Sequence, residues 1–182
     1  ITVALDTSGT ATEGTDYTDG SGNVDDITIS AGDTTGTVNF TPTDDSVYEG
    51  NETATISING VSGKSGVAEH GTPQAVTITI TDNESAPTVT LATSATSIAE
   101  NAGSSLTLTA TLSVATTADV TVELSTSGTA TEGTDYTDGS GVIDDITISA
   151  GSTTGTVNFT PTDDSVYEGN ETAIISIGSV SG

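Results

Sequence analysis

The chain has 182 residues and a formal charge of −25, because 26 acidic residues stand against one basic residue, Lys64. Binding to phosphates needs Lys and Arg, so this charge excludes nucleic acid as a natural partner and argues against docking on anionic lipid. No stretch approaches the roughly 20 apolar residues of a membrane span, so we expect no membrane insertion. The absence of cysteine excludes disulfides and thiolate metal sites.

Apolar residues alternate with threonine over several short segments, and no stretch shows a helical stripe. Val120, Val122 and Leu124, for example, alternate with polar residues, which is the period-two pattern of a half-buried strand. Threonine suits the outward positions because it is β-branched. In chain order, the pattern predicts strands at 1–6, 24–30, 35–41, 53–59, 75–81, 88–93, 104–113 and 119–125.

Loops of distinct composition separate these strands. A Gly- and Thr-rich loop at 8–23 follows the first strand, and an acidic loop at 41–53 follows the third. A second loop at 60–73 holds Lys64 and the only histidine, His70, and a linker occupies 82–87. The Asp pairs Asp25-Asp26 and Asp144-Asp145 are expected to face solvent from a strand, and the four tyrosines are expected to pack at the ends of the domains.

An internal repeat sets the domain organisation. Residues 1–63 align with 120–182 without a gap and differ at nine positions: 1, 4, 6, 23, 24, 33, 55, 59 and 60. Near-identity at a period of 119 residues indicates tandem copies of one domain, and the period suits one β-sandwich. We therefore expect an all-β fold of two tandem, immunoglobulin-like antiparallel sandwiches of about seven strands, at 1–83 and 84–182.

The two copies begin and end at different points of the repeat. The first starts without the two strands expected at 88–113, and the second stops before a counterpart of 64–83. We expect a fragment of a longer array, in which the first domain lacks its opening strands and the second its closing strand. The expected partners are neighbouring repeats of the same chain, together with strand-edge pairing between truncated chains.

One acidic loop, TPTDDSVYEGNET, occurs at both 41–53 and 160–172. Each copy places four carboxylates within nine residues, with no Lys or Arg among them. Two such charges 4 Å apart repel by about 4 kcal/mol at an effective dielectric near 20. The loop either splays into water or binds a cation, and oxygen ligands suit Ca²⁺. The carboxylates belong to Asp44, Asp45, Glu49 and Glu52 in the first copy, and to Asp163, Asp164, Glu168 and Glu171 in the second.

Four motifs, SIAENAG, SGTATEGTDY, DDSVYEGNE and TDNE, together resemble the Calx-β family. These are Ca²⁺-binding sandwiches of sodium/calcium exchangers that also occur in arrays in large bacterial surface proteins. The resemblance covers essentially the whole chain and implies a Ca²⁺ site at one end of each sandwich. It implies further ligands from Asp16 and Asp135, from Glu100, from the backbone carbonyls of Val47 and Val166, and from Asp82 and Glu84 in the linker.

Two departures from the family pattern imply fewer ions or weaker binding. Family members often have three consecutive acids in the main loop and three more at the linker. In this chain the third position of the loop is Ser46 or Ser165, and the linker reads Asp82, Asn83, Glu84. The first copy also has no counterpart of Glu100.

The residues give no support for catalysis. The chain has one histidine, no base visibly placed beside a Ser or Thr nucleophile, and only 3% aromatic residues. Paired carboxylates can serve a glycosidase, but such an enzyme normally has an aromatic-lined cleft. The expected function is a Ca²⁺-rigidified spacer in a large extracellular, adhesin-like protein of a bacterial surface. The alternative is a Ca²⁺-sensing pair of regulatory domains, as in sodium/calcium exchangers, which near-identical repeats disfavour.

Overall fold

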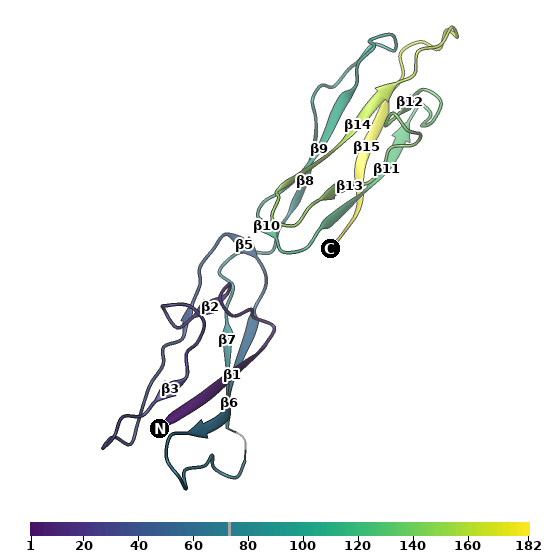
Figure 1. Cartoon of the computed structure of the whole chain (residues 1–182). Helices are drawn as coiled ribbons and strands as arrows, with labels where there is room; N and C mark the ends of the chain where they lie inside the picture. The colour runs from purple at the N-terminus through teal and green to yellow at the C-terminus, as the bar shows by residue number, and fades with distance from the viewer. Residues whose placement is uncertain (73) are drawn as a thin grey trace. The chain divides into compact units, whose positions relative to one another are not determined.

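The computed structural model describes residues 1–72 and 74–182, which form antiparallel β-strands joined by loops (Figure 1). The all-β prediction is therefore confirmed. The chain divides into two compact units, Ile1–Asn83 and Glu84–Gly182, hereafter unit 1 and unit 2. None of the described residues belongs to a helix with the length and hydropathy needed to cross a bilayer.

Unit 1 is built on one sheet of four strands in the order β3-β1-β6-β7. In β6 and β7, Ala, Val or Ile alternates with Thr or Ser over most of the paired length, so one face can pack while the other meets water. The sheet strands are β1 (Thr2–Gly9), β3 (Ile27–Thr28), β6 (Glu52–Ser62) and β7 (Ala75–Ile80), and shorter strands are β2 (Tyr17–Thr18), β4 (Thr41–Pro42) and β5 (Val47–Tyr48).

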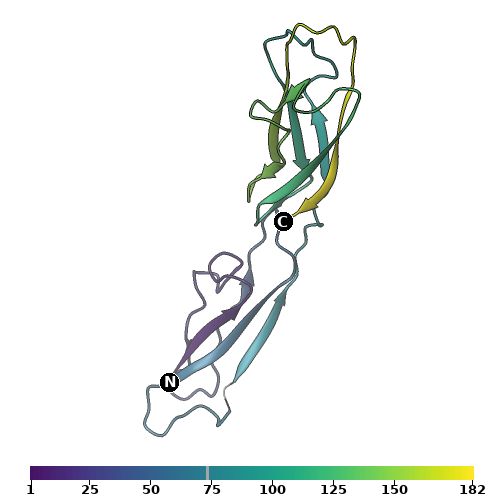
Figure 2. The ribbon, with the colours of Figure 1, turned by 90° about the vertical axis from the view of Figure 1, so that its right-hand side faces the viewer.

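Unit 2 contains two sheets, in the orders β13-β11-β15 and β12-β14-β9-β8. The second sheet includes β8 and β9, to which no described strand of unit 1 corresponds. Figure 2 shows the strands of unit 2 running along its length in two layers. Its strands are β8 (Val89–Thr93), β9 (Leu106–Leu112), β10 (Ala115–Thr116), β11 (Val120–Gly128), β12 (Tyr136–Thr137), β13 (Ile146–Ile148), β14 (Thr154–Pro161) and β15 (Ala173–Ser181).

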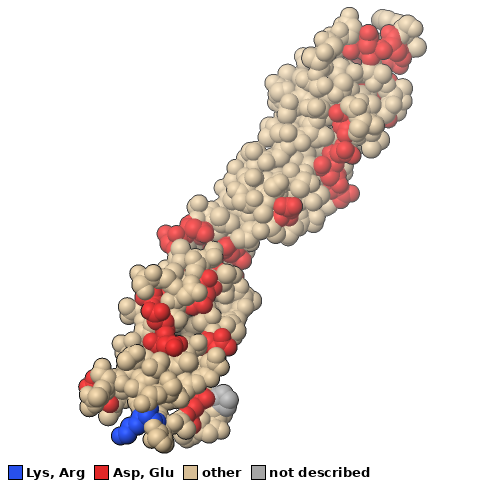
Figure 3. Space-filling model, viewed as in Figure 1, with Lys and Arg blue, Asp and Glu red and all other residues tan. Residues whose placement is uncertain are grey.

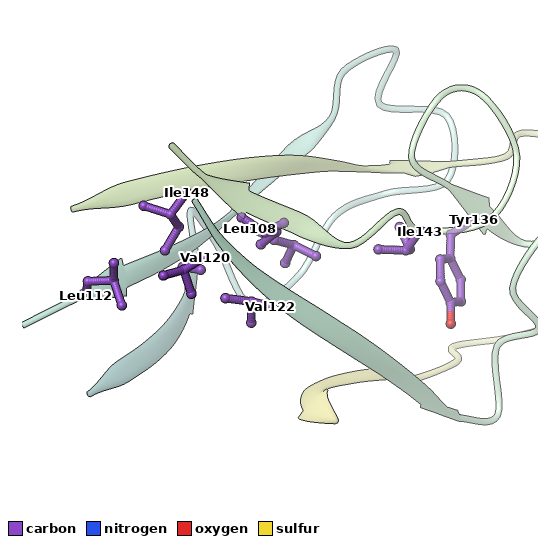
Figure 4. Close-up of a cluster of buried hydrophobic side chains, with 9 residues drawn as sticks. Leu108, Leu112, Val120, Val122, Tyr136, Ile143 and Ile148 are labelled. Atoms are coloured by element: carbon purple, nitrogen blue, oxygen red, sulfur yellow. The ribbon is translucent and has the colours of Figure 1, made fainter. Parts of the chain in front are cut away.

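The core of unit 2 lies between these two sheets (Figure 4). Alternate residues of β9 face alternate residues of β11 and β13, as the pleat requires. At the end of the unit, Tyr136 is buried and stacks on Phe159 with ring centroids 4.6 Å apart. The buried residues are Leu108, Ala110, Leu112, Val120, Val122, Tyr136, Ile143, Ile146 and Ile148.

Unit 1 has a much smaller buried cluster, formed by Ala11, Tyr17 and Ala54. Tyr17 stacks on Phe40 at 4.7 Å, the same contact as in unit 2. The expectation that tyrosines pack at the domain ends therefore holds for Tyr17 and Tyr136. It is wrong for Tyr167, which is 96% exposed because it lies in the acidic loop beyond the end of β14.

Two predicted strands of unit 1 are much shorter than expected. The strand predicted at 24–30 is reduced to Ile27–Thr28, and that predicted at 35–41 to Thr41–Pro42. Asp25 and Asp26 consequently lie before β3 rather than in it, and Asp26 accepts a hydrogen bond from the Leu5 N–H at 3.0 Å. Leu5 lies at a register shift in the pairing of β1 with β6. The Asp26 carboxylate therefore provides a hydrogen-bond acceptor where the regular pairing is interrupted.

Candidate metal centre

The Gly-rich loop after β1 fixes Asp16 at the end of unit 1. The Asp16 side chain is only 8% exposed and accepts a hydrogen bond from the Thr12 N–H at 2.6 Å. Its backbone carbonyl accepts another from the Thr43 N–H at 2.9 Å, which joins the Gly-rich loop to the start of the acidic loop. In unit 2, Asp135 has the same two contacts, with Thr131 at 2.6 Å and Thr162 at 2.9 Å.

A second carboxylate, Glu13, holds the Gly-rich loop in shape. One of its oxygens accepts from the Thr7 hydroxyl at 3.0 Å, and the other from the Val24 N–H at 2.6 Å. Glu132 repeats this arrangement in unit 2, with the Thr126 hydroxyl at 2.8 Å and the Ile143 N–H at 2.6 Å. Sequence reasoning missed this role, because nothing in the motif TATEGTDY distinguishes a loop-supporting glutamate from a solvated one.

The turn from β1 into this loop requires glycine. Gly9 has φ +130°, and a Cβ there would lie 2.0 Å from the Thr53 carbonyl oxygen. That oxygen accepts hydrogen bonds from the Thr10 and Ala11 N–H groups, both at 3.0 Å. The backbones must approach closely for these bonds to form, and only glycine permits both the approach and the φ value. Gly128 repeats the geometry at φ +125°.

The acidic loop brings two glutamates to the fixed aspartate. Glu52 is the first residue of β6, and Glu49 lies three residues before it in the loop. Ligand oxygens of Asp16, Glu49 and Glu52 all lie within 4.8 Å of one another. In unit 2 the same holds for Asp135, Glu168 and Glu171, and Figure 3 shows acidic atoms gathered at the end of unit 2 that carries the loop between β14 and β15.

These two carboxylate clusters have an electrostatic signature in common. Burial, followed by the charges of Asp16 and Glu49, raises the pKa of Glu52. In unit 2 the charge of Asp135 is the main cause that raises the pKa of Glu168, while burial and then the same charge raise the pKa of Glu171. The carboxylates of a cluster therefore destabilise one another's ionised forms. A bound cation would relieve this repulsion.

In unit 1, Asp82 lies against the acidic loop from the end of β7. One of its carboxylate oxygens accepts hydrogen bonds from the Glu49 N–H at 2.8 Å and the Gly50 N–H at 2.6 Å. The Asp82 N–H donates to the Asn51 side chain at 3.1 Å, and the Asn83 side chain donates to Asp44 at 3.1 Å. The charge of Asp82 also contributes to the raised pKa of Glu52. The structure thus brings the predicted ligand Asp82 beside the cluster.

In unit 2, Glu100 reaches the acidic loop from the segment between β8 and β9. Its carboxylate accepts a hydrogen bond from the Asp164 N–H at 3.1 Å. Its charge contributes to the raised pKa of both Glu168 and Glu171. Glu100, separated from Asp164 by 64 positions in the sequence, therefore lies next to the cluster, and its role as the ligand that the resemblance implies stays a prediction.

The other predicted ligands lie outside the two clusters. Asp45 and Asp164 accept from the N–H two residues ahead, at 2.8 Å and 2.6 Å, and so shape the loop. Asp44 and Asp163 are exposed, Val47 is half-buried in β5, Val166 is 62% exposed, and Glu84 is half-buried at the first position of unit 2. Metal binding by these residues stays a prediction.

The clustered carboxylates fit a Ca²⁺ ion. Two oxygens at the observed limit of 4.8 Å can each lie about 2.4 Å from one ion, within the Ca²⁺–oxygen range. Carboxylates alone, with no thiolate or imidazole, are the donor set of a hard cation. The ion would be held by Asp16, Glu49 and Glu52 in unit 1 and by Asp135, Glu168 and Glu171 in unit 2, where it would supply the missing positive charge.

Comparison with known proteins agrees with the all-β fold. No curated protein and no solved structure matches the chain. The family model of the Calx-beta domain matches it twice, at residues 1–84 and 82–182. Calx-beta domains are non-catalytic β-sandwich domains associated with Ca²⁺ binding. The two matches span essentially all of the sequence, and the chain therefore belongs to the Calx-beta family as a tandem pair of its domains.

Proposed function

We propose that each unit binds Ca²⁺ through its carboxylate cluster and that the pair acts as a Ca²⁺-rigidified spacer. The observation that carries the proposal is the convergence of three carboxylates in each unit, in a chain whose only Lys or Arg is Lys64. Without a cation these groups repel, and the repulsion helps to raise the pKa values of Glu52, Glu168 and Glu171. A divalent ion replaces the repulsion with coordination, so it stabilises the folded arrangement of the loops.

The stiffening role follows from where the candidate ligands lie along the chain. Asp82 lies two residues before the start of unit 2 and is hydrogen-bonded to the acidic loop of unit 1. Ordering this segment with an ion restricts the chain as it leaves the unit. The near-identical repeats 1–63 and 120–182, each with the same cluster, suit a part that supplies length, because paired sensors tend to differ from each other.

The setting that suits this role is a large adhesin-like protein on a bacterial surface. Extracellular Ca²⁺ sites typically bind in the 10⁻⁴ to 10⁻³ M range, whereas cytosolic sensors respond near 10⁻⁷ to 10⁻⁵ M. A Ca²⁺ titration of the full chain therefore also separates the spacer from the sensing pair, since saturation at micromolar Ca²⁺ would favour the sensor.

Calorimetry of the chelator-stripped chain tests the metal sites. Ca²⁺ should bind with an affinity that Glu171→Gln weakens about tenfold or more for one of the two units, because the substitution removes a ligand charge and keeps the bulk. Changing Glu123→Gln is the matched control. Glu123 is an exposed acid of the same unit whose carboxylate is hydrogen-bonded to Ser179, away from the cluster. Equal loss in both variants would mean that net charge, rather than a site, attracts the ion.

Small-angle scattering tests the spacer. The distribution of interatomic distances should be narrower in millimolar Ca²⁺ than in chelator, and chelation should lower the melting temperature. A variant carrying Glu49→Gln with Asp82→Asn should scatter alike in both conditions. If the wild-type distribution does not respond to Ca²⁺ although calorimetry shows binding, the ion is bound but does not stiffen the chain.

A further inference from the structure

The differences between the two repeats gather where β1 meets β6 in unit 1 and where β11 meets β15 in unit 2. Both strand pairs contain the same irregularity, a β-bulge that inserts one extra residue into the second strand. Four of the nine positions at which the repeats differ lie at this bulge or directly beside it. The same backbone feature therefore carries different chemistry in each unit. The residues are Ala4, Asp6, Asn59 and Gly60 in unit 1, and Glu123, Ser125, Gly178 and Ser179 in unit 2.

In unit 1 the extra residue of the bulge is Asn59. Ile58 and Gly60 pair with consecutive residues of β1, and the register of β6 with β7 ends at Ser57. Asn59 therefore has no cross-strand partner among the described strands, and its side chain is exposed. The backbone at Asn59 is consequently less restrained than in the regular ladder, and the side-chain amide is open to water.

An asparagine that precedes a glycine can react with its own main chain. The backbone nitrogen of Gly60 attacks the side-chain amide carbon of Asn59 and forms a bond to it. The bond from that carbon to the amide nitrogen breaks, and this nitrogen leaves as ammonia with the proton of the Gly60 N–H. Water then opens the resulting succinimide ring at either carbonyl carbon, which gives aspartate or isoaspartate. Glycine favours the first step because it has no side chain beside the attacking nitrogen.

The surroundings of Gly60 leave room for this reaction. Apart from its chain neighbours, no described heavy atom lies within 4 Å of where a Cβ on Gly60 would be. A regular ladder holds the backbone extended by hydrogen bonds, whereas the bulge interrupts the ladder at this point. Among the asparagines of the sequence, only Asn59 precedes a glycine. The equivalent positions of unit 2 are Gly178 and Ser179, so that unit lacks the reactive pair.

The product places a second carboxylate beside Asp6. In unit 2, a Cβ on Gly178 would lie 2.6 Å from the Oγ of Ser125 and 3.7 Å from its Cβ, so these two positions are neighbours across the strands. Unit 1 has the same register, and its corresponding residues are Asn59 and Asp6. A neutral amide is compatible with the Asp6 carboxylate, whereas an aspartate repels it. Like charges that face each other across a strand pair are destabilising.

We propose that Asn59-Gly60 is a self-modification site, at which deamidation adds a negative charge beside Asp6 and weakens the pairing of β1 with β6. In unit 2 the corresponding bulge is stable to this chemistry, and the Glu123 carboxylate there accepts a hydrogen bond from the Ser179 hydroxyl. Water is the only co-reactant, so the reaction does not depend on the proposed Ca²⁺ sites. The two nearly identical repeats therefore lose stability at different rates in solution.

Mass spectrometry of the aged full chain tests the reaction. After incubation in warm, mildly alkaline buffer, cleavage after glutamate releases residues 53–69, in which Asn59 is the only asparagine. This peptide should gain the mass difference between an amide and an acid, and part of it should contain isoaspartate. Gly60→Ala should slow the reaction severalfold, and the open space around Gly60 lets this variant fold. Equal rates at Asn59 and at the other asparagines, or in the wild type and Gly60→Ala, would overturn the proposal.

Calorimetry of the full chain tests the consequence. Asn59→Asp reproduces the aspartate product and should lower the melting temperature, and hydrogen exchange should assign the loss to unit 1. The loss should shrink at high salt, which screens exposed charges. In an Asp6→Ser background, which has the residue of unit 2 at this position, Asn59→Asp should cost little. An equal loss with and without Asp6 would overturn the proposed charge repulsion.

Discussion

The octapeptide TGTVNFTP occurs in both units and forms a full strand in only one of them. In unit 2 it is β14, which pairs with β9 from Thr154 to Phe159. In unit 1 the same letters at 35–42 form a strand only at Thr41–Pro42. The difference lies in the neighbour, because the described residues of unit 1 include no counterpart of β9. Strand formation therefore depends on a partner as much as on local propensity.

The core follows the same rule. Ile146 and Val122 have no exposed surface in unit 2, whereas their counterparts Ile27 and Val3 are only partly buried. Nearly identical side chains thus pack fully where the second sheet is present and partly where it is not. Full burial of these side chains therefore depends on two packed sheets rather than on the sequence of one of them.

The carboxylate clusters behave differently, because they are alike in the two units. Asp16 and Asp135 are each fixed by a backbone N–H four residues earlier and by the first turn of the acidic loop. These hydrogen bonds lie within the Gly-rich loop and between it and the acidic loop, so they form in both units although the described residues of unit 1 include no counterpart of β8 and β9. The three carboxylates of each cluster are thus held by two loops that both units contain, whereas the core of unit 2 also needs β8 and β9.

The largest effect should come from a core truncation made in both units. Ile146→Ala should lower the free energy of unfolding of unit 2 by about 2–5 kcal/mol, because it opens a cavity in a packed core. Ile27→Ala should lower that of unit 1 by less than about 1.5 kcal/mol, because the side chain is already partly exposed. Calorimetry of the full chain measures both losses, and hydrogen exchange assigns them to a unit. Equal losses would mean that the two cores are equally packed.

Substitution of the turn glycine should affect the units equally. Gly128→Ala and Gly9→Ala should each lower the free energy of unfolding by about 1–3 kcal/mol, because both positions have left-handed φ values and closely approaching backbones. The same calorimetric scans give the two values. Gly20→Ala is the control, since it also has a positive φ but no atom within 4 Å of the added Cβ. A loss confined to unit 2 would show that this turn depends on the second sheet.

The dependence of folding stability on pH should have opposite signs with and without Ca²⁺. A carboxyl group whose pKa is raised by folding binds its proton more tightly in the folded state, so stability rises as the pH falls through that pKa. Glu52, Glu168 and Glu171 are such groups, with an ordinary value of 4.5. Hydrogen bonds in their turns lower the pKa of Asp19 and Asp138 from the ordinary value of 3.8. These two groups therefore make the folded state less stable as the pH falls, but only below about pH 3.8.

The melting temperature of the Ca²⁺-free chain should therefore rise as the pH falls from 7 toward this glutamate range. In saturating Ca²⁺ it should fall, because protons compete with the ion for the same oxygens. A variant with Glu168→Gln and Glu171→Gln should lose most of what unit 2 contributes to this change of melting temperature with pH, both with and without Ca²⁺. A melting temperature that rises on acidification even in Ca²⁺ would argue that the ion does not occupy the clusters.

The sequence predicted the all-β fold and part of each carboxylate cluster, and it failed where a distant segment decides the structure. The acidic motif placed Glu49 and Glu52 in one group, the resemblance to the Calx-β family added Asp16, and the structure brings the three carboxylates together. The strand at 35–41 was not predictable from its own letters, because pairing with a distant segment decides it. The supporting role of Glu13 was equally hidden, since its partners Thr7 and Val24 meet it only in the folded loop.

The smallest effect should come from exchanging the residues at which the β6 and β15 edges differ. Ile174 is 56% exposed and lies on β15, which pairs with β11 alone among the described strands, so Ile174→Thr should change the stability of unit 2 by no more than about 0.5 kcal/mol. Thr55 instead shares a 3.0 Å hydrogen bond with the Thr77 hydroxyl across the β6–β7 pair. Thr55→Ile should therefore destabilise unit 1 by a few tenths to about 1 kcal/mol. Calorimetry on both variants resolves the order. If Thr55→Ile instead stabilises unit 1, the apolar contact of isoleucine outweighs the lost hydrogen bond, and the pairing of β6 with β7 rests on side-chain packing rather than on this hydroxyl pair.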